Sequence, residues 1–292
     1  MKKFWIRTAS SVVYVALFLG TMLSGVILNN ELAGTLIFLA FLLFVACGCT
    51  FEFYRIAKMK GANPIEWLGY VVACLTIITF PYLDIVDISK GGTFDFLTVL
   101  GFVGVFVCFL LAMPLAAIIQ LWRKSDSPFG DIGYTFLSVF YIALPLGLML
   151  FLHSYNPYVL MLVVALLWIN DACAYMLGSM IGKHKMWPKH SPGKTWEGTV
   201  AGVAIATAIG ACIVRFWPNV FGNMETWQGA MLGFVCGAIG TMGDLVESML
   251  KRSVGLKDSG KILPGHGGFL DRFDSLLILM PFATIFIVLF TM

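Results

Sequence analysis

The chain has 292 residues, of which only 12% are charged and 59% are hydrophobic, and its mean hydropathy is +0.89. Soluble domains carry about 25% charged residues, twice this share. One core has no room for so much apolar surface, so the composition excludes a water-soluble globule and indicates a protein whose solvent is the lipid bilayer. A net charge of +3 is also too small for a nucleic-acid-binding protein, so we expect no nucleic-acid partner.

Polar interruptions divide the sequence into nine apolar stretches, each close to the ~20 residues that a membrane-spanning helix needs. They are residues 6–28, 32–54, 65–82, 95–122, 132–152, 157–182, 198–217, 227–250 and 269–291. The predicted fold class is therefore an all-α, polytopic integral membrane protein with about nine transmembrane helices. The first stretch is too long for a signal peptide and lacks a small-residue cleavage site, so we expect a retained anchor.

The basic residues predict the orientation of these spans. With a cytoplasmic N-terminus, 17 of the 19 Lys and Arg residues lie inside and only Lys90 and Arg215 lie outside. The opposite topology would invert this ratio, against the positive-inside rule. We therefore predict a cell-membrane protein with an external C-terminus and with residues 125–130, 183–193 and 253–266 on the cytoplasmic side, where the active site should lie.

The first 165 residues are mainly hydrophobic spans with charges at their ends. We assign residues 1–165 to packing, lipid access and dimer contacts, and residues 166–292 to a catalytic transmembrane region with cytoplasmic loops. Glu52 lies beside Arg55 near the end of the second stretch. We expect Glu52 to snorkel or to pair at the membrane interface, in a structural role that a Gln would fill with mild effect.

Asp171 lies in the middle of the stretch 157–182, with no basic residue adjacent to it. A carboxylate at this depth costs on the order of several kcal/mol unless it faces a polar cavity or a partner. Asp171 is therefore a candidate functional residue, although a helix-to-helix hydrogen bond from Asn170 or Asp171 would also explain it.

A basic loop follows that stretch and contains the run Ser191-Pro192-Gly193-Lys194-Thr195. A tight turn flanked by hydroxyls and an ammonium group suits phosphate oxygens near the start of a helix. The spacing is not that of a P-loop, and lysines in this loop would also serve as a positive-inside signal. We take three of these side chains as candidate substrate-binding residues: Ser191, Lys194 and Thr195.

The stretch 227–250 combines small and charged residues. Glycines at four-residue spacing, Gly229, Gly233 and Gly237, predict a surface for close helix packing. Further along, one face of the helix carries Asp244, Glu247, Ser248, Lys251 and Arg252. A chain of ion pairs, such as Glu247 with Lys251, is one interpretation of this face.

The segment 257–268 argues against ion pairing alone, because it is basic and rich in glycine and can bring backbone N–H groups to an anion. It contains Lys257, Gly267, Gly268 and His266, which is a candidate phosphate donor, base or loop hydrogen-bonder. The last span then begins with Asp271, Arg272 and Asp274, and its two acids share one helix face.

Several carboxylates beside several lysines fit a hard divalent cation on the acids and a polyphosphate that spans the metal and the bases. Oxygen ligands without a Cys or His grouping favour Mg²⁺ or Mn²⁺ over zinc, and leave room for a second cation such as K⁺. The candidate metal ligands are Asp171, Asp244, Glu247, Asp271 and Asp274.

The run from Ser248 to Asp274, SMLKRSVGLKDSGKILPGHGGFLDRFD, resembles the signature of the phosphatidate cytidylyltransferases, also called CDP-diacylglycerol synthases. It meets the spacing S-x-x-K-R, K-D and P-G-H-G-G-x-x-D-R-x-D at every fixed position. Asn170-Asp171 and residues 191–198 resemble the upstream motifs of that family. The detailed match covers about the last 125 residues, and the first 165 match only in hydropathy.

The resemblance implies an integral membrane enzyme that condenses CTP with phosphatidic acid, giving CDP-diacylglycerol and pyrophosphate, and that requires Mg²⁺. On this interpretation the catalytic residues are Asp244, Asp271, Lys251, Lys257 and His266. The substrate-binding residues are Ser191, Lys194, Thr195, Ser248, Arg252, Gly267, Gly268 and Arg272. We also expect a homodimer in contact with membrane lipids.

Two other functions are considered beside this one. A CTP-dependent polyprenol or lipid kinase would release CDP rather than pyrophosphate. A transporter would distribute polar residues across the depth of the membrane, whereas here they concentrate at one side.

Overall fold

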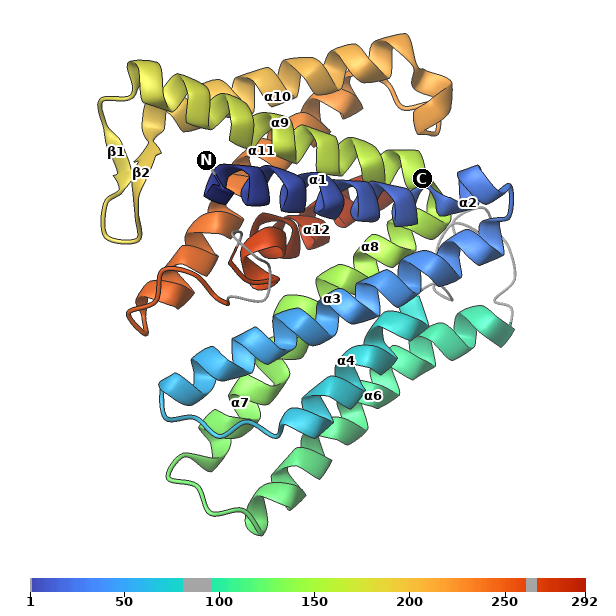
Figure 1. The fold of residues 1–292 in the computed structure, drawn as a ribbon. Coiled ribbons are helices and arrows are strands. Elements are labelled where there is room, and N and C mark those ends of the chain that lie inside the picture. The colour runs from blue at the N-terminus through green and yellow to red at the C-terminus, as the bar shows by residue number, and fades with distance from the viewer. Residues whose placement is uncertain (1, 81–95, 261–266) are drawn as a thin grey trace. The chain divides into compact units, whose positions relative to one another are not determined.

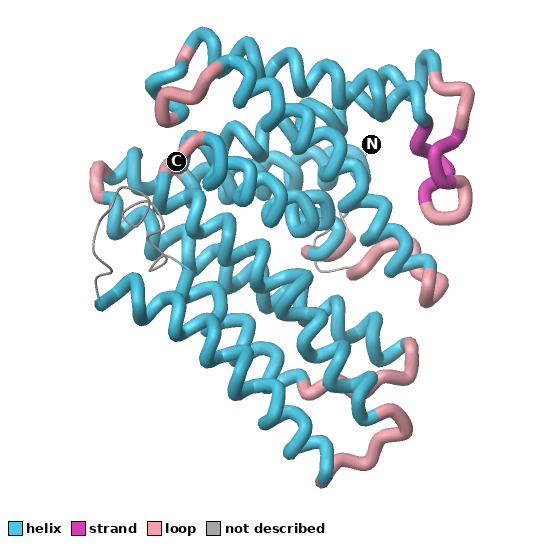
Figure 2. Tube along the Cα trace, turned by 180° about the vertical axis from the view of Figure 1, so that it is seen from behind, coloured by secondary structure: helices cyan, strands magenta, loops and turns pink. Residues whose placement is uncertain are grey.

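The computed structural model describes residues 2–80, 96–260 and 267–292, most of which are helical. Figure 2 shows that short loops and one strand pair account for the rest of the described chain. The chain divides into two compact units. Unit 1 comprises residues 1–154 and 258–272, and unit 2 comprises residues 155–257 and 273–292.

The described part of unit 1 is built mainly from helices (Figure 1). They are α1 (Lys2–Met22), α2 (Ser24–Leu28), α3 (Glu31–Met59), α4 (Glu66–Thr79), α6 (Phe96–Leu121), α7 (Pro128–Ser138) and α8 (Leu144–Tyr155). A π-helical turn, Val139–Ala143, connects α7 to α8. Helix α4 packs against both α3 and α6, and the side chains of Phe38, Leu42 and Ile77 are fully buried in the core.

The helix ends of unit 1 follow from local sequence. Asn29 adopts the left-handed conformation, with φ of 51°, and ends α2. Asn30 then caps α3, because its side-chain oxygen accepts a hydrogen bond from the N–H of Ala33 at 3.0 Å. At the other end of α3, the buried carboxylate of Asp131 accepts from the N–H of Asn63 at 2.6 Å and so fixes the turn that leads into α4.

Unit 2 contains three long helices, most of a fourth and a β-hairpin. Its elements are α9 (Pro157–Ile181), β1 (Lys185–Trp187), β2 (Ser191–Thr195), α10 (Trp196–Phe216), the 3₁₀ turn Pro218–Phe221, α11 (Thr226–Arg252) and α12 (Leu270–Phe290). The first three residues of α12 belong to unit 1. Helix α10 packs against both α9 and α11, as Figure 1 shows.

Glycines allow the helices of unit 2 to approach closely. A Cβ atom at Gly233 would overlap the backbone of Ala206 on α10, and one at Gly229 would overlap the carbonyl oxygen of Gly210. The prediction that the glycine spacing of 227–250 marks a packing surface is confirmed at these positions.

The hairpin is an addition to the predicted all-α fold. Strands β1 and β2 are antiparallel, with Lys185 opposite Thr195 and Trp187 opposite Ser191. The sequence predicts a loop here, because the strands are short and carry Pro, Gly and Lys, residues that are depleted in sheets. Glu197 fixes the base of the hairpin, since its carboxylate accepts from the backbone N–H groups of Lys183 and His184 at 3.2 Å.

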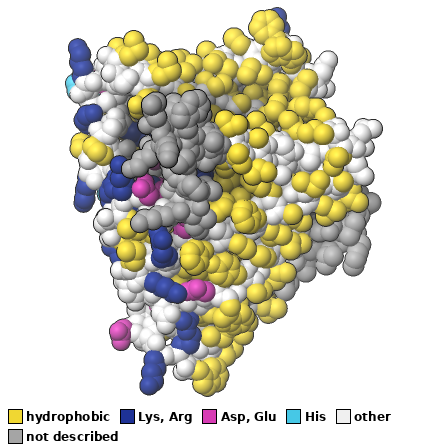
Figure 3. Space-filling view, in the orientation of Figure 1, with side chains coloured by type: hydrophobic (Ala, Val, Ile, Leu, Met, Phe, Trp, Pro, Cys, Tyr) yellow, Lys and Arg dark blue, Asp and Glu magenta, His cyan; other side chains and the backbone are white. Residues whose placement is uncertain are grey.

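The membrane character predicted from composition is borne out by the helices. Six of the described helical segments, one of them the continuous run α7 to α8, are long and apolar enough to cross a membrane. Shorter apolar helices cover Val12–Met22, Glu66–Thr79 and Phe109–Leu121. Figure 3 shows hydrophobic side chains over much of the visible face, which suits lipid rather than water. The protein is therefore a helical, multi-pass membrane protein, while the count of nine crossings and their orientation stay predictions.

Candidate active site

The hairpin of unit 2 brings a lysine onto α11. Lys194, near the end of β2, lies with its Nζ 2.7 Å from the Oδ2 atom of Asp244 and donates a hydrogen bond to the carbonyl oxygen of Thr241 at 3.0 Å. Only 21% of the Lys194 side chain is exposed. A residue of the predicted phosphate loop is thus joined to the predicted acidic face of the helix.

The two hydroxyl residues of the same loop are placed differently. The hydroxyl of Thr195 caps α10, where it accepts a hydrogen bond from the N–H of Gly198 at 3.3 Å, and the residue is buried. Ser191 lies at the other end of β2, paired in register with Trp187. Of the three residues predicted in this loop, Lys194 is the one that the structure joins to the acids of α11.

The polar face of α11 divides into a buried part and an exposed part. Glu247 is fully buried and forms an ion pair with Lys251, one turn further on, whose side chain is 12% exposed. Ser248 lies with its hydroxyl 3.4 Å from Asp244 Oδ1. Arg252 is exposed and donates to the carbonyl oxygen of Leu256 at 2.9 Å, so its guanidinium supports the end of the helix.

Three carboxylates converge in unit 2, from Asp244, Glu247 and Asp274. Each offers an oxygen atom within 4.8 Å of the others. The close approach of α12 depends on Gly243, because a Cβ atom there would lie 2.8 Å from the Cα of Ser275. We call Asp244, Glu247 and Asp274 the carboxylate cluster.

The carboxylate cluster fits a hard divalent cation. Its donors are all oxygen atoms, it is buried or half-buried, and three acids lie beside two lysines, Lys194 and Lys251. Like charges held this close repel one another unless cations balance them. An oxygen-only site of this kind suits Mg²⁺ or Mn²⁺.

Asp171 and Asn170, on α9, have separate roles. Asn170 is fully buried and its amide donates to the hydroxyl of Thr241 on α11 at 3.3 Å, which is the helix-to-helix bond considered above. Asp171 is exposed, accepts from the Asn170 amide at 3.2 Å and interacts electrostatically with Lys194 and Asp244. Asp171 therefore lies beside the carboxylate cluster without being one of its three converging acids.

In unit 1, Asp271 organises the segment that precedes α12. Its Oδ2 atom accepts from the backbone N–H of Ser259 at 2.9 Å and from that of Gly268 at 2.8 Å. Gly267 adopts φ of +81°, and a Cβ atom there would overlap the Asp271 carboxylate. The N–H of Gly268, predicted to face a phosphate, is thus bonded to Asp271, while Arg272 is exposed.

The remaining predicted site residues are His266 and Lys257. His266 lies outside the described residues, within 261–266. Lys257 is exposed at the end of its segment of unit 2, two residues after the turn at Gly255, which has φ of +72°.

The expectation that Glu52 reaches the membrane interface is wrong. Its side chain is fully buried instead of reaching the membrane interface, and it accepts hydrogen bonds from Ser259, Phe269 and Leu270. The guanidinium of Arg55 donates to the carbonyl oxygen of Ser259. These partners lie more than 200 positions away along the chain, so the sequence around Glu52 gave no signal of them.

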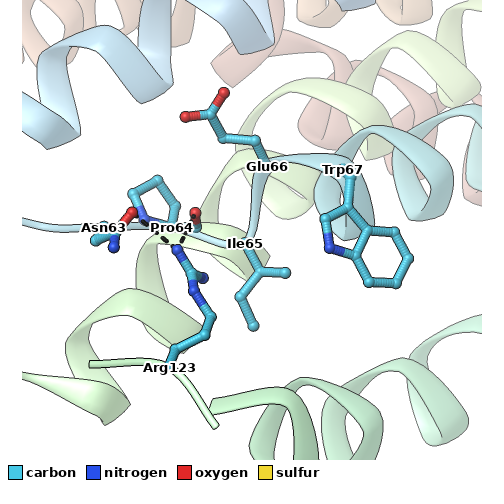
Figure 4. A pocket seen from close by; sticks show the side chains of 6 residues that line it. All are labelled: Asn63, Pro64, Ile65, Glu66, Trp67 and Arg123. Atoms are coloured by element: carbon cyan, nitrogen blue, oxygen red, sulfur yellow. Dashed lines mark hydrogen bonds between the residues drawn. The ribbon is translucent and has the colours of Figure 1, made fainter. Parts of the chain in front are cut away.

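A cavity of about 370 Å³ lies elsewhere in unit 1, lined by Asn63, Pro64, Ile65, Glu66, Trp67 and Arg123 (Figure 4). Arg123 donates to the side-chain oxygen of Asn63 at 2.8 Å and to the carbonyl oxygen of Pro64 at 3.4 Å. None of the predicted site residues lines this cavity. The guanidinium of Arg123 holds the turn before α4, so we do not assign the active site to this cavity.

Comparisons with known proteins show which proteins this chain is similar to. Phosphatidate cytidylyltransferase of Staphylococcus aureus is 28% identical over 286 residues, which cover 97% of this chain and 98% of the relative. The protein of the same name from Staphylococcus epidermidis is 30% identical over 247 residues, covering 77% and 93%. That of Staphylococcus haemolyticus is 37% identical over 167 residues, covering 56% and 62%.

A model of the cytidylyltransferase family matches residues 5–290. The similarity therefore extends through the first 165 residues, where the sequence analysis found a match in hydropathy alone. Because the family model spans nearly the whole chain and the signature matches at every fixed position, the chain belongs to the cytidylyltransferase family.

Proposed function

We propose that this protein is a phosphatidate cytidylyltransferase, which transfers the cytidylyl group of CTP to phosphatidic acid and forms CDP-diacylglycerol and pyrophosphate. The family and the names of its relatives support this reaction. The observation that carries it is the carboxylate cluster with Lys194 and Lys251 beside it, because two anionic substrates can meet only where their charges are balanced.

The carboxylate cluster would hold Mg²⁺ or Mn²⁺, with Asp171 beside it. Bound there, the cation would neutralise negative charge on the triphosphate and on the departing pyrophosphate. Asp271 lies in unit 1 and belongs to the signature that runs from Ser248 to Asp274. Because of that signature we keep Asp271 as a catalytic residue. We also propose that a second cation such as K⁺ can bind and that His266 is a catalytic residue.

The lysines would exchange partners when substrate binds. In the structure, Lys194 pairs with Asp244 and Lys251 pairs with Glu247. Phosphate oxygens offer the same charge-assisted contacts, and each such hydrogen bond is worth about twice a neutral one. Lys257, Arg252 and Arg272 are exposed and would make the first contacts with CTP from water.

The reaction needs no strong general base. A phosphate monoester has its second pKa at about 6, so the phosphate of phosphatidic acid is largely dianionic at neutral pH. Its oxygen attacks the α-phosphorus of CTP, the bond from that phosphorus to the bridging oxygen breaks, and pyrophosphate leaves. The work of the protein is therefore to position the two substrates and to balance their charge.

The setting of the site supports access from two phases. Lys194, the start of α10 and the last turns of α11 share one end of unit 2, which in the predicted topology is the cytoplasmic end. CTP would arrive there from water and phosphatidic acid from the surrounding bilayer.

We further propose that the protein crosses the cytoplasmic membrane nine times and forms a homodimer. A single cysteine at position 189 should react with an impermeant thiol reagent only after the cells are permeabilised.

One assay tests the proposed function. Purified protein is incubated with α-labelled CTP, phosphatidic acid and Mg²⁺, and the reaction is then extracted with organic solvent. Label in the organic phase, together with release of pyrophosphate, is the expected result. Label left in water as CDP would instead indicate a lipid kinase, and absence of any turnover would favour a transporter.

A further inference from the structure

We propose that Glu52 is a positioning residue for the active site, which fixes Ser259 and the segment 267–270 and thereby orients Asp271. This inference rests on the proposed function. It concerns a residue of α3, in the part of the chain that sequence analysis assigned to packing and lipid access.

The first observation is that, among the described residues, the Glu52 carboxylate accepts hydrogen bonds from Ser259 and from two residues of the segment 267–270. Its Oε2 atom accepts from the Ser259 hydroxyl at 2.7 Å and from the N–H of Leu270 at 3.0 Å. Its Oε1 atom accepts from the N–H of Phe269 at 3.1 Å. One buried carboxylate thus ties Ser259 to the first turn of α12, and satisfies N–H groups that have no partner within the helix.

The second observation is that Glu52 and Asp271 bind neighbouring backbone donors among the described residues. Asp271 accepts from the backbone N–H groups of Ser259 and Gly268, and Glu52 accepts from the next two amides along the chain. Three consecutive N–H groups, of Gly268, Phe269 and Leu270, are therefore fixed by two carboxylates. Loss of one carboxylate loosens the backbone that holds the other.

The third observation is that a whole stripe of α3 is shaped for this contact. The ring of Phe44 lies edge-on to that of Phe269, with 5.3 Å between the ring centroids. A Cβ atom at Gly48 would lie 2.6 Å from the Phe269 ring, so glycine is required for the close approach. Together with Arg55, which binds the Ser259 carbonyl oxygen, these residues recur along one face of α3.

Close packing on the carboxylate itself points the same way. A Cβ atom at either Gly260 or Gly268 would overlap the oxygens of Glu52. The backbone on both sides of the carboxylate is thus in direct contact with it. A residue that only filled space in a hydrophobic core would not require an acid here, because burying a carboxylate is costly without such donors.

The test uses Glu52→Gln, which keeps the size of the side chain but replaces an acceptor with an amide group that faces N–H donors. Hydrogen exchange of residues 267–270 is measured without CTP and without Mg²⁺. We expect exchange about tenfold faster or more than in the wild type. In the lipid transferase assay, kcat should fall by about tenfold or more while KM for CTP and for phosphatidic acid stays within about threefold.

Tyr54→Phe is the matched control, since it also removes a buried hydrogen bond from α3. The Tyr54 hydroxyl bonds with Ser138 Oγ at 2.7 Å, away from the segment that Glu52 holds. This variant should lower the melting temperature yet leave exchange at 267–270 and kcat unchanged. Normal exchange and normal kcat in Glu52→Gln, with a similar loss of melting temperature, would reduce Glu52 to a structural residue and overturn the proposal.

Gly48→Val is a second variant for the case in which Glu52→Gln does not fold. It leaves the carboxylate in place and displaces Phe269. Faster exchange at 267–270 with a lower kcat is expected, and wild-type behaviour would overturn the proposal. The exchange measurement does not depend on the reaction, so a wild-type protein without transferase activity would refute the proposed function and still leave the positioning role open to test.

Discussion

Buried acids occur in both units, and their surroundings differ in kind. In unit 1, Glu52 accepts from a hydroxyl and two backbone amides, and Asp131 accepts from Asn63, Gln120 and Ser125 at 2.5 to 2.9 Å. In unit 2, Asp244, Glu247 and Asp274 face one another, with lysines beside them.

This difference separates two uses of a carboxylate. An acid surrounded by N–H and O–H donors is satisfied by the protein and fixes its backbone. Acids that face one another have negative charge in excess, which an external cation can balance. Residue type alone therefore does not identify a metal site, whereas the partners of each acid do.

The largest expected effect is that of Asp244→Asn. The amide keeps the shape but loses the charge that holds a hard cation and pairs with Lys194. Transferase activity should fall by about a thousandfold, or about 4 kcal/mol of transition-state stabilisation. The melting curve with and without Mg²⁺ provides the check on folding, because the wild type alone should gain stability from the cation. Activity above about a tenth of the wild type would exclude direct ligation by Asp244.

A smaller effect is expected for Lys251→Gln. If Lys251 contacts the phosphates of CTP, kcat/KM for CTP should fall by about a hundredfold. Lys58→Gln is a suitable control, since Lys58 pairs with Glu66 at an exposed site in unit 1 and should leave the kinetics unchanged. If the Lys251→Gln variant melts early but shows normal kcat/KM when assayed in the cold, Lys251 only neutralises the neighbouring acids and does not bind CTP.

Gly243→Ala should have a moderate effect. The new methyl group would meet the Ser275 backbone at 2.8 Å and push α12 away from α11, which changes the spacing between Asp244 and Asp274. We expect activity to fall by about tenfold, since small misplacements of catalytic groups are costly. Gly133→Ala, where nothing lies within 4 Å of the added atom, should keep full activity. Equal activity in the two variants would argue against a role for this close approach.

The smallest effect on catalysis is expected for Thr195→Ala. The hydroxyl caps α10, so its loss should cost about 1 kcal/mol of stability and leave kcat/KM for CTP within about threefold. Thr195→Ser should restore the cap and the melting temperature. A loss of kcat/KM near that of Lys251→Gln would instead place the hydroxyl on a phosphate.

Much of unit 2 could be predicted from sequence because its information is local. The polar face of α11 follows from helical periodicity, and Glu247 and Lys251 pair one turn apart as expected. The glycine spacing predicted helix packing for the same reason. The hairpin was missed because its strands are only three and five residues long and contain residues typical of turns.

Unit 1 shows what sequence patterns cannot supply. An acid beside a base, such as Glu52 with Arg55, is typical of a helix end at the membrane surface. Neither of these two residues indicates that Ser259 and Phe269 will pack on the same face of α3. Gly48 and Gly268 are the residues that allow this contact, since Gly48 makes room for Phe269 and Gly268 makes room for Glu52. A glycine gives no hint of which partner that is until the fold is known.

Binding of Mn²⁺, measured by electron paramagnetic resonance on the purified protein in detergent, tests the central claim most directly. The account predicts that Asp274→Asn abolishes or strongly weakens Mn²⁺ binding, because it removes one of three converging carboxylates. Asp131→Asn, which alters an acid already satisfied by donors, should bind the ion like the wild type. Undiminished binding in Asp274→Asn, or an equal loss in both variants, would contradict the assignment of the metal site to the carboxylate cluster.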